Sequence, residues 1–150
     1  MTSDRFIRRQ SVEGQMAQLY HFVSAGQRQA LWECLTKGEE RAYFRGLVAE
    51  YAHRVATMPV TYEQAALGEN ATAHLHYFTG DRDWWITERD TSAQQLRVFG
   101  WARCGHEEPE AGYVCVEELC AAGAELDLHW TPKPIAKCLM TRTTGYTLNM

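Results

Sequence analysis

Apolar residues in the first third of the chain recur with the period of an α-helix. Between positions 12 and 23 they fall at i, i+4, i+7, i+8 and i+11, which is the spacing of one helical face. Ser11 is a residue type that caps a helix start, and Gly26 is one that ends a helix. The same period predicts a second helix over 27–37 and a third, with the strongest pattern, over 39–56.

Beyond Met58-Pro59 the period changes from that of a helix to the alternation of β-strands. The first three strands are separated by gaps too short for helical crossovers, so this part of the sheet should be antiparallel. The predicted elements are strands over 71–79, 83–89, 96–104 and 113–115, a helical turn over 116–122, and a fifth strand over 126–130 that Pro132 and Pro134 stop.

These elements predict an α+β fold, with N-terminal helices packed with a mainly antiparallel sheet of about five strands. The chain then divides into a helical segment over 1–58, a sheet region over 59–140 and a polar tail over 141–150. A length of 150 residues is typical of about one domain, so we expect the two larger parts to form one compact domain together.

The link between the first two strands allows two registers. A two-residue Gly80-Asp81 loop of type II′ places Tyr77 opposite Trp84, whereas a longer loop places His76 opposite Ile86. We favour the first register because it gathers the large apolar side chains on one face of the hairpin. The other face then carries His74, His76, Trp85 and Thr87.

Charge divides at the same boundary as the period. The formal net charge of −4 consists of +2 on residues 1–58 (8 basic, 6 acidic) and −6 on residues 59–150 (7 basic, 13 acidic). This acidity argues against a protein that coats DNA or RNA, so direct nucleic-acid binding is not expected. A DNA-binding regulator that uses segment 1–58, with Arg5, Arg8 and Arg9 on phosphate, is the weakest of our hypotheses.

No signal peptide or apolar run of membrane-spanning length is present, which predicts a cytoplasmic protein with no membrane partner. The five cysteines are odd in number and show no C-x-x-C pair, so they are expected to be free thiols.

An ordered set of motifs runs through the strand-rich part of the chain. It comprises HLHYF at 74–78, DWWITERD at 83–90, FG at 99–100, EAGYV at 110–114, EL at 118–119, ELDLHW at 125–130 and PKP at 132–134. With these motifs, the block from about 59 to 135 resembles the DUF2958 family of bacterial proteins. The resemblance implies a gene carried by a plasmid, phage or other mobile element, often beside anti-restriction genes. It implies no reaction, because the family offers no established catalytic residues.

Histidines near the sheet are the candidate metal ligands. His74 and His76 lie two apart on a strand and share a face, and Asp127 and His129 do the same on the last strand. If the two strands lie side by side, His74, His76 and His129 would serve a small metal-dependent hydrolase or nuclease. The chain carries no established metal motif, so we favour histidines that are simply hydrogen-bonded on a half-exposed sheet face.

Aromatic and acidic residues are the candidate partner-binding residues. Trp84 and Trp85 are adjacent on a strand and face opposite sides of the sheet, so either helices cover the second face or one tryptophan is exposed. Exposed tryptophans anchor protein interfaces, and acidic side chains complement a basic partner. The predicted partner-binding residues are Trp84, Trp85, Glu107, Glu108, Glu110 and Asp127.

We therefore expect a non-enzymatic binding protein from a bacterial mobile element or phage. It would inhibit a host defence system, as an anti-CRISPR or anti-restriction protein, by protein–protein contact. Its partner would be a host protein or a ribonucleoprotein defence complex. No cofactor is expected, no catalytic residue is assigned, and the oligomeric state stays open.

Overall fold

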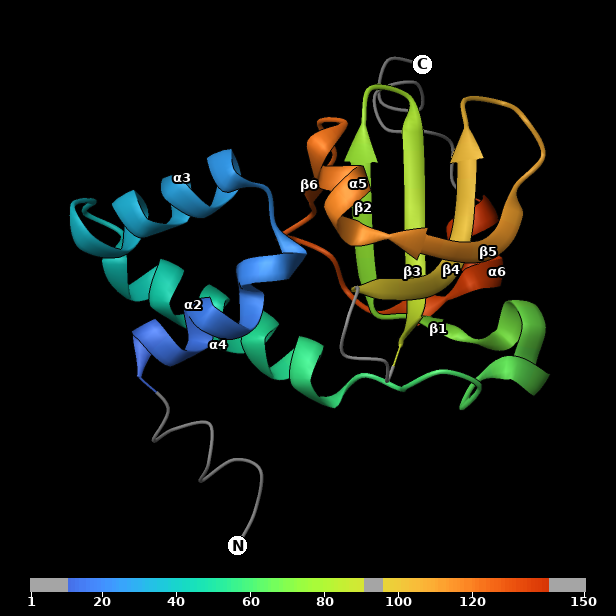
Figure 1. The fold of residues 1–150 in the computed structure, drawn as a ribbon, viewed down its shortest axis with the longest axis horizontal. Helices are drawn as coiled ribbons and strands as arrows, with labels where there is room; N and C mark the ends of the chain where they lie inside the picture. Colours follow the sequence, from blue (N-terminus) through green and yellow to red (C-terminus); the bar gives the residue numbers. More distant parts are fainter. Residues whose placement is uncertain (1–10, 91–95, 141–150) are drawn as a thin grey trace, which may run out of the picture. The chain divides into compact units, whose positions relative to one another are not determined.

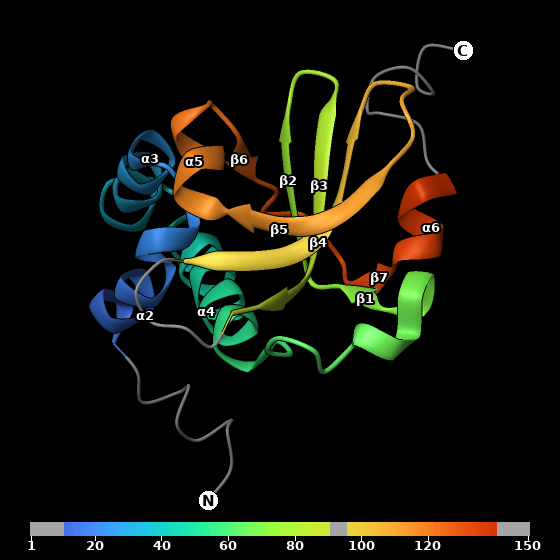
Figure 2. The same ribbon diagram turned by 45° about the vertical axis from the view of Figure 1, so that its right-hand side comes forward.

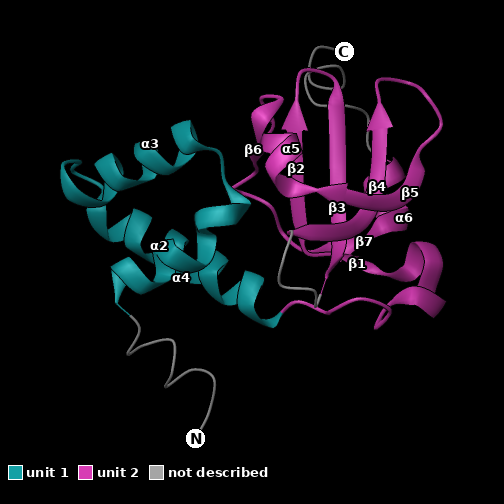
Figure 3. Cartoon of the chain, viewed as in Figure 1, with its two compact units in different colours: residues 1–57 teal, residues 58–150 magenta. Residues whose placement is uncertain are grey.

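A computed structural model describes residues 11–90 and 96–140 of the chain, so the polar tail and the N-terminal arginines lie outside the described residues. The chain forms two compact units, Met1–Thr57 and Met58–Met150 (Figure 3). Their boundary falls where the helical period of the sequence gives way to strands. The α+β prediction is confirmed by helices in the first unit and a five-stranded antiparallel sheet in the second. None of the helices in the described ranges has the length and apolar character needed to cross a membrane.

Over its described residues, 11–57, the first unit contains three α-helices and one 3₁₀ turn (Figure 1). The predicted cap of the first helix is confirmed, because Ser11 Oγ accepts a hydrogen bond from the backbone N–H of Gly14 at 3.0 Å. The prediction that Gly26 ends this helix is wrong. Ser24 caps a new helix instead, and Gly26 lies in the first turn of that helix. The elements are α2 (Val12–Leu19), η1 (Tyr20–Phe22), α3 (Ala25–Thr36) and α4 (Arg41–Thr57), with α2 and α3 both in contact with α4.

The second unit is built on an antiparallel sheet with the strand order β5-β4-β3-β2-β6 (Figure 1). Its strands are β2 (Leu75–Thr79), β3 (Arg82–Arg89), β4 (Arg97–Cys104), β5 (Glu110–Cys115) and β6 (Glu125–Leu126). A separate two-stranded ladder joins β1 (Thr72–Ala73) to β7 (Lys133–Pro134). The helical elements of this unit are η2 (Ala65–Asn70), α5 (Val116–Ala121) and α6 (Ile135–Met140).

The β2–β3 hairpin has the favoured register. Tyr77 is opposite Trp84, and His76 is opposite Trp85. Gly80 has a φ of +57°, whereas Asp81 is not among the residues with positive φ, which is the sign pattern of a type II′ turn. The longer-loop alternative is therefore excluded.

The C-terminal part of the second unit departs from the predictions. The expected strand over 126–130 stops at Leu126, because Asp127 Oδ1 accepts a hydrogen bond from the backbone N–H of His129 at 2.9 Å and turns the chain. Helix α6 was not predicted. It follows directly on Pro134, which pairs with Thr72 in the β1–β7 ladder.

Two irregularities bend the sheet near its centre. The pairing of β3 with β4 shifts by one residue between Ile86 and Glu88, so that Thr87 forms a β-bulge. On the next two strands, Gly100 is directly opposite Gly112. Figures 1 and 2 show β4 and β5 curving strongly, as glycines in strand interiors permit.

Helix α6 and the β1–β7 ladder pack on one face of the sheet. The buried cluster there contains Ala73, Trp85, Ile135 and Cys138, with Trp101, Trp130 and Leu139 packed against it. Trp130 Nε1 donates a hydrogen bond to the carbonyl of Ala73 at 2.9 Å, which fixes the chain after β6 to this face.

Candidate functional site

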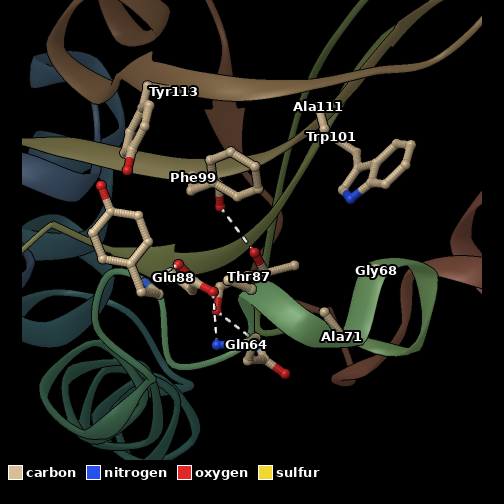
Figure 4. A pocket seen from close by; sticks show the side chains of 11 residues that line it. Gln64, Gly68, Ala71, Thr87, Glu88, Phe99, Trp101, Ala111 and Tyr113 are labelled. Carbon is tan, nitrogen blue, oxygen red and sulfur yellow. Dashed lines mark hydrogen bonds between the residues drawn. The ribbon is translucent and has the colours of Figure 1, made fainter.

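A pocket of about 370 Å³ opens beside the bend of the sheet in the second unit (Figure 4). This volume is within the range of sites for small molecules. In Figure 4 the aromatic side chains of β4 and β5 lie across the pocket from Gln64 and Ala71. Its lining residues are Tyr62, Gln64, Ala65, Gly68, Ala71, Thr87, Glu88, Phe99, Trp101, Ala111 and Tyr113.

The aromatic wall of the pocket follows from strand alternation around the two glycines. Phe99 and Trp101 flank Gly100 on β4, and residues two apart on a strand share a face. Their partners on β5 are Tyr113 and Ala111, which flank Gly112 in the same way. Phe99 and Tyr113 meet edge to face, with ring centroids 5.3 Å apart. The bend therefore lies within the wall that carries the aromatic side chains.

The β-bulge places Glu88 on the pocket side of the sheet. Trp85 pairs with Trp101 and Glu88 pairs with Phe99, so both β3 residues share the face of the aromatic wall. In a regular strand, residues three apart would face opposite sides. The extra residue Thr87 shifts the alternation by one, so that Glu88 faces the same side as Trp85. Thr87 Oγ1 donates to the carbonyl of Phe99 at 3.2 Å. Bulges often redirect a side chain in this way beside functional sites.

Glu88 is 3% exposed and holds the segment before η2 against the sheet. One carboxylate oxygen accepts from the backbone N–H of Tyr62 at 2.8 Å, and the other accepts from that of Gln64 at 2.8 Å. The Gln64 amide in turn donates to the carbonyls of Thr87 and Thr72 and accepts from the backbone N–H of Thr72. This network fixes the part of the pocket that lies opposite the aromatic wall.

Tyr62 stands in an unusual backbone conformation at the pocket. Residues 60–63 form a turn that the backbone N–H of Glu63 closes by donating to the carbonyl of Val60 at 3.0 Å. Tyr62 has a φ of +75° at the third position, where a type II turn normally takes Gly or Asn. Its side chain is 75% exposed and shares a hydrogen bond with Tyr113. This hydrogen bond from Tyr62 raises the pKa of Tyr113 above its ordinary value. Such strain is typical of positions retained for a function.

The predicted tryptophan surface is not available to a partner. Trp84 is 6% exposed and Trp85 is 3% exposed, so neither presents a free side chain. Trp85 is covered because α6, which the sequence analysis missed, packs on its face. Of the two possibilities, a covered second face or an exposed tryptophan, the structure has the first: α6 packs over the face that carries Trp85.

The predicted acidic residues fall into two places. Glu107, Glu108 and Glu110 are exposed at and beside the β4–β5 connection, where they stay available to a partner. Asp127 instead binds His76, with Oδ2 at 2.9 Å from Nδ1. The structure therefore does not gather these four carboxylates with the two tryptophans into one surface.

His76 is enclosed between two carboxylates and three aromatic rings. Its Nε2 is 2.8 Å from Asp83 Oδ1, on the side opposite the contact with Asp127. Burial alone lowers the pKa of His76, but the hydrogen bonds and charges of Asp127 and Asp83 outweigh it and raise the pKa above 6.5. The rings of Phe78 and Trp85 stack on the imidazole, and the ring of Trp130 is tilted against it.

The proposed metal ligands do not form a site. Both ring nitrogens of His76 are engaged by carboxylates, so neither is open to a metal ion. His129 is exposed on the turn after β6, and His74 contributes its backbone N–H to the carbonyl of Ile86. Within 11–90 and 96–140, no group of three His, Cys, Asp or Glu side chains is arranged to hold a metal ion.

The sequence analysis did not find the pocket, although it considered the case in which the strands of His76 and Asp127 lie side by side. The available signal was the pair of glycines, each flanked by wall residues on the pocket side. Nothing in the sequence indicated that Tyr62 and Gln64 line the pocket, because their position depends on the hydrogen bonds from their backbone N–H groups to Glu88 on β3.

Comparison with known proteins gives no match: no family model fits the sequence, and neither the curated proteins nor the solved structures contain a significant relative. The resemblance to the DUF2958 family therefore stays a prediction, and the site is interpreted from its own geometry.

Proposed function

We propose that this chain is a non-enzymatic binding protein that holds a ligand, or a side chain of a partner, in the aromatic pocket of its second unit. The observation that carries the proposal is the pocket itself, with a volume of about 370 Å³ and walls formed by Tyr62, Phe99, Trp101 and Tyr113. Pockets that are mostly apolar, with a few convergent polar groups, are the usual sites of ligand binding.

The construction of the pocket supports this function. A bulge, a pair of bending glycines and a strained tyrosine all occur at its lining or directly beside it. Each feature weakens regular structure, and their coincidence at one place is typical of a functional site. The polar groups favour binding over catalysis, because Gln64 and Glu88 are engaged in hydrogen bonds to the backbone rather than paired as acid and base.

The finer proposal is that the partner belongs to a host defence system and that the protein comes from a mobile element or phage. Its support is the resemblance of residues 59–135 to the DUF2958 family, together with the exposed acidic residues at the β4–β5 connection. Phage and plasmid establishment, measured in a host with an active CRISPR or restriction system, tests it. Equal establishment with and without the expressed protein would contradict it.

Nuclear magnetic resonance of the indole N–H groups tests the binding proposal directly. The chain has five tryptophans, of which Trp101 lines the pocket and Trp32 lies in the other unit. A panel of small apolar, anionic and cationic fragments is expected to include at least one that shifts the Trp101 signal and leaves Trp32 unchanged. A panel in which no fragment shifts Trp101 would refute the proposal. The Trp101→Leu variant assigns the signal.

The strain at Tyr62 predicts opposite effects of one substitution on stability and binding. Asn accepts a positive φ more readily than Tyr, so Tyr62→Asn should raise the free energy of unfolding by about 1 kcal/mol. The same change removes an aromatic side chain from the pocket and should weaken any ligand found by the fragment panel. Urea denaturation and calorimetric titration measure the two effects. A variant that is destabilised, or that binds as well as the wild type, would show that Tyr62 is not retained for binding.

A further inference from the structure

The charge in the pocket has one sign. Among the eleven described residues that line it, Glu88 is the one ionisable group apart from the two tyrosines, and none is Lys, Arg or His. Both oxygens of the Glu88 carboxylate accept backbone hydrogen bonds, so the group is held as an acceptor. Within the described ranges, no Lys, Arg or His nitrogen forms a salt bridge with Glu88. The pocket therefore contains a buried carboxylate with no cation of its own.

The cation at the edge of the pocket is already paired. Arg97 lies over the outer part of the wall, with its guanidinium carbon 5.2 Å from the centroid of the Tyr113 ring. Its Nη2 is 3.0 Å from Asp90 Oδ2, and Arg97 does not line the pocket. Among the described residues, the Glu88 carboxylate is thus hydrogen-bonded by two backbone N–H groups but is not neutralised by a cationic side chain.

Four aromatic side chains line the same space as this carboxylate. The faces of Tyr, Trp and Phe rings attract cations, and the attraction is stronger where water is excluded. An alkylated ammonium ion is the ligand class that needs both features, because its methyl groups pack on rings while its charge is balanced by a carboxylate. A neutral apolar ligand would use the rings alone, and an anion would be repelled by Glu88.

On these grounds we propose that the pocket binds an alkylated ammonium cation, with Glu88 as its counter-ion and Phe99, Trp101, Tyr62 and Tyr113 as its aromatic cage. This inference rests on the proposed function, since it names the ligand class of the same pocket. Glu88 would balance the charge of the ligand, and the aromatic wall, bent at Gly100 and Gly112, would give the site its shape.

Choline and its neutral isostere 3,3-dimethylbutan-1-ol test the inference, because the two differ in charge and hardly in shape. Choline should shift the Trp101 indole signal and leave Trp32 unchanged, and it should bind about tenfold or more tightly than the alcohol. Trp101→Leu should weaken choline binding by about 3- to 30-fold, as measured by calorimetry.

Glu88→Gln should reduce the preference for choline over the alcohol to the part that the aromatic rings alone supply, whereas Glu108→Gln, which removes an exposed carboxylate outside the pocket, should leave it unchanged. A variant that loses only folding stability would weaken both ligands equally, so the ratio separates the two effects. Should Glu88→Gln fail to fold, the ratio of the wild-type affinities for choline and for the alcohol still decides whether the ligand is a cation.

The possible failures are distinguishable. Equal binding of choline and the alcohol, or binding of the alcohol alone, overturns the proposal of a cationic ligand and leaves the proposed binding function in place. Failure of choline, of the alcohol and of the fragment panel to shift Trp101 overturns both proposals.

Discussion

His76→Phe is expected to lower the free energy of unfolding by about 3–5 kcal/mol, the range seen when one partner of a buried ion pair is removed. The imidazole is hydrogen-bonded to Asp83 and Asp127 at 2.8 and 2.9 Å, and both contacts would be lost together. Asp83 would be left with neither oxygen hydrogen-bonded, because its other oxygen already has no hydrogen-bond partner. The phenyl ring is somewhat larger than imidazole and leaves no cavity, so the effect measures lost polar contacts together with the cost of a slightly overfilled site.

Urea denaturation measures this change, and His21→Phe is the matched control. His21 is exposed on η1 in the other unit, and substitution there should change stability by less than about 0.5 kcal/mol. A loss below about 1 kcal/mol for His76→Phe would mean that the carboxylates are hydrated in place of their imidazole partner, contrary to the burial of Asp83.

The difference in unfolding free energy between wild type and His76→Phe should depend on pH, which identifies its electrostatic origin. The pKa of His76 is raised, since the carboxylates outweigh the effect of burial, so its contribution is complete below the unfolded value near 6.5 and declines as pH rises through the folded value. Burial alone would raise the pKa of Asp127, but the hydrogen bonds from His76 and His129 outweigh burial and lower the pKa. The contribution of Asp127 to stability therefore declines as pH falls below about 3.9. The stability difference between wild type and His76→Phe should be largest between about pH 4 and 6.5. A difference that does not vary with pH would indicate packing alone.

The same cluster shows how far the sequence could be interpreted. Alternation and the Gly80 turn were sufficient for the register of the β2–β3 hairpin, and with it the placement of His76 and Trp85 on one face. The condition that the last strand lies beside the strand of His76 is met, and Asp127 contacts His76 there. The chemistry differed from the metal hypothesis, because a second carboxylate, Asp83, lies across the hairpin from Phe78 and takes the remaining ring nitrogen.

Other parts of the fold depended on contacts that periodicity does not contain. Residues 126–130 alternate like a strand, but the chain turns after Asp127. The backbone N–H of Asp127 still donates to the carbonyl of His76, and its side chain accepts from the backbone N–H of His129. The bulge at Thr87 leaves no mark in the pattern of β3, although it decides which face Glu88 occupies. The pocket in turn needs the loop around Tyr62 to meet strands more than twenty residues away, a contact that only the folded chain supplies.

Gly100→Ala is the second substitution for which we expect a large loss, of about 4 kcal/mol or more. A Cβ atom at this position would lie 2.1 Å from the carbonyl oxygen of Trp85 and 2.9 Å from the Cα of Ile86. Both are backbone atoms of β3, so no side-chain rotation relieves the clash, and β3 and β4 must separate. Gly100 is not among the residues with positive φ, so the requirement for glycine is one of space.

Gly112→Ala provides the control at the directly opposite position. Nothing lies within 4 Å of a Cβ built there, and its φ is not positive, so alanine should be neutral or stabilise the chain by about 0.4–1 kcal/mol. Thermal unfolding of the two variants therefore compares one chemical change on paired residues of adjacent strands. Similar melting temperatures would contradict the close approach of β3 to β4. A selective loss in Gly100→Ala, accompanied by a shift of the Trp101 indole signal, would show that the close approach that stabilises the sheet also shapes the aromatic wall of the pocket.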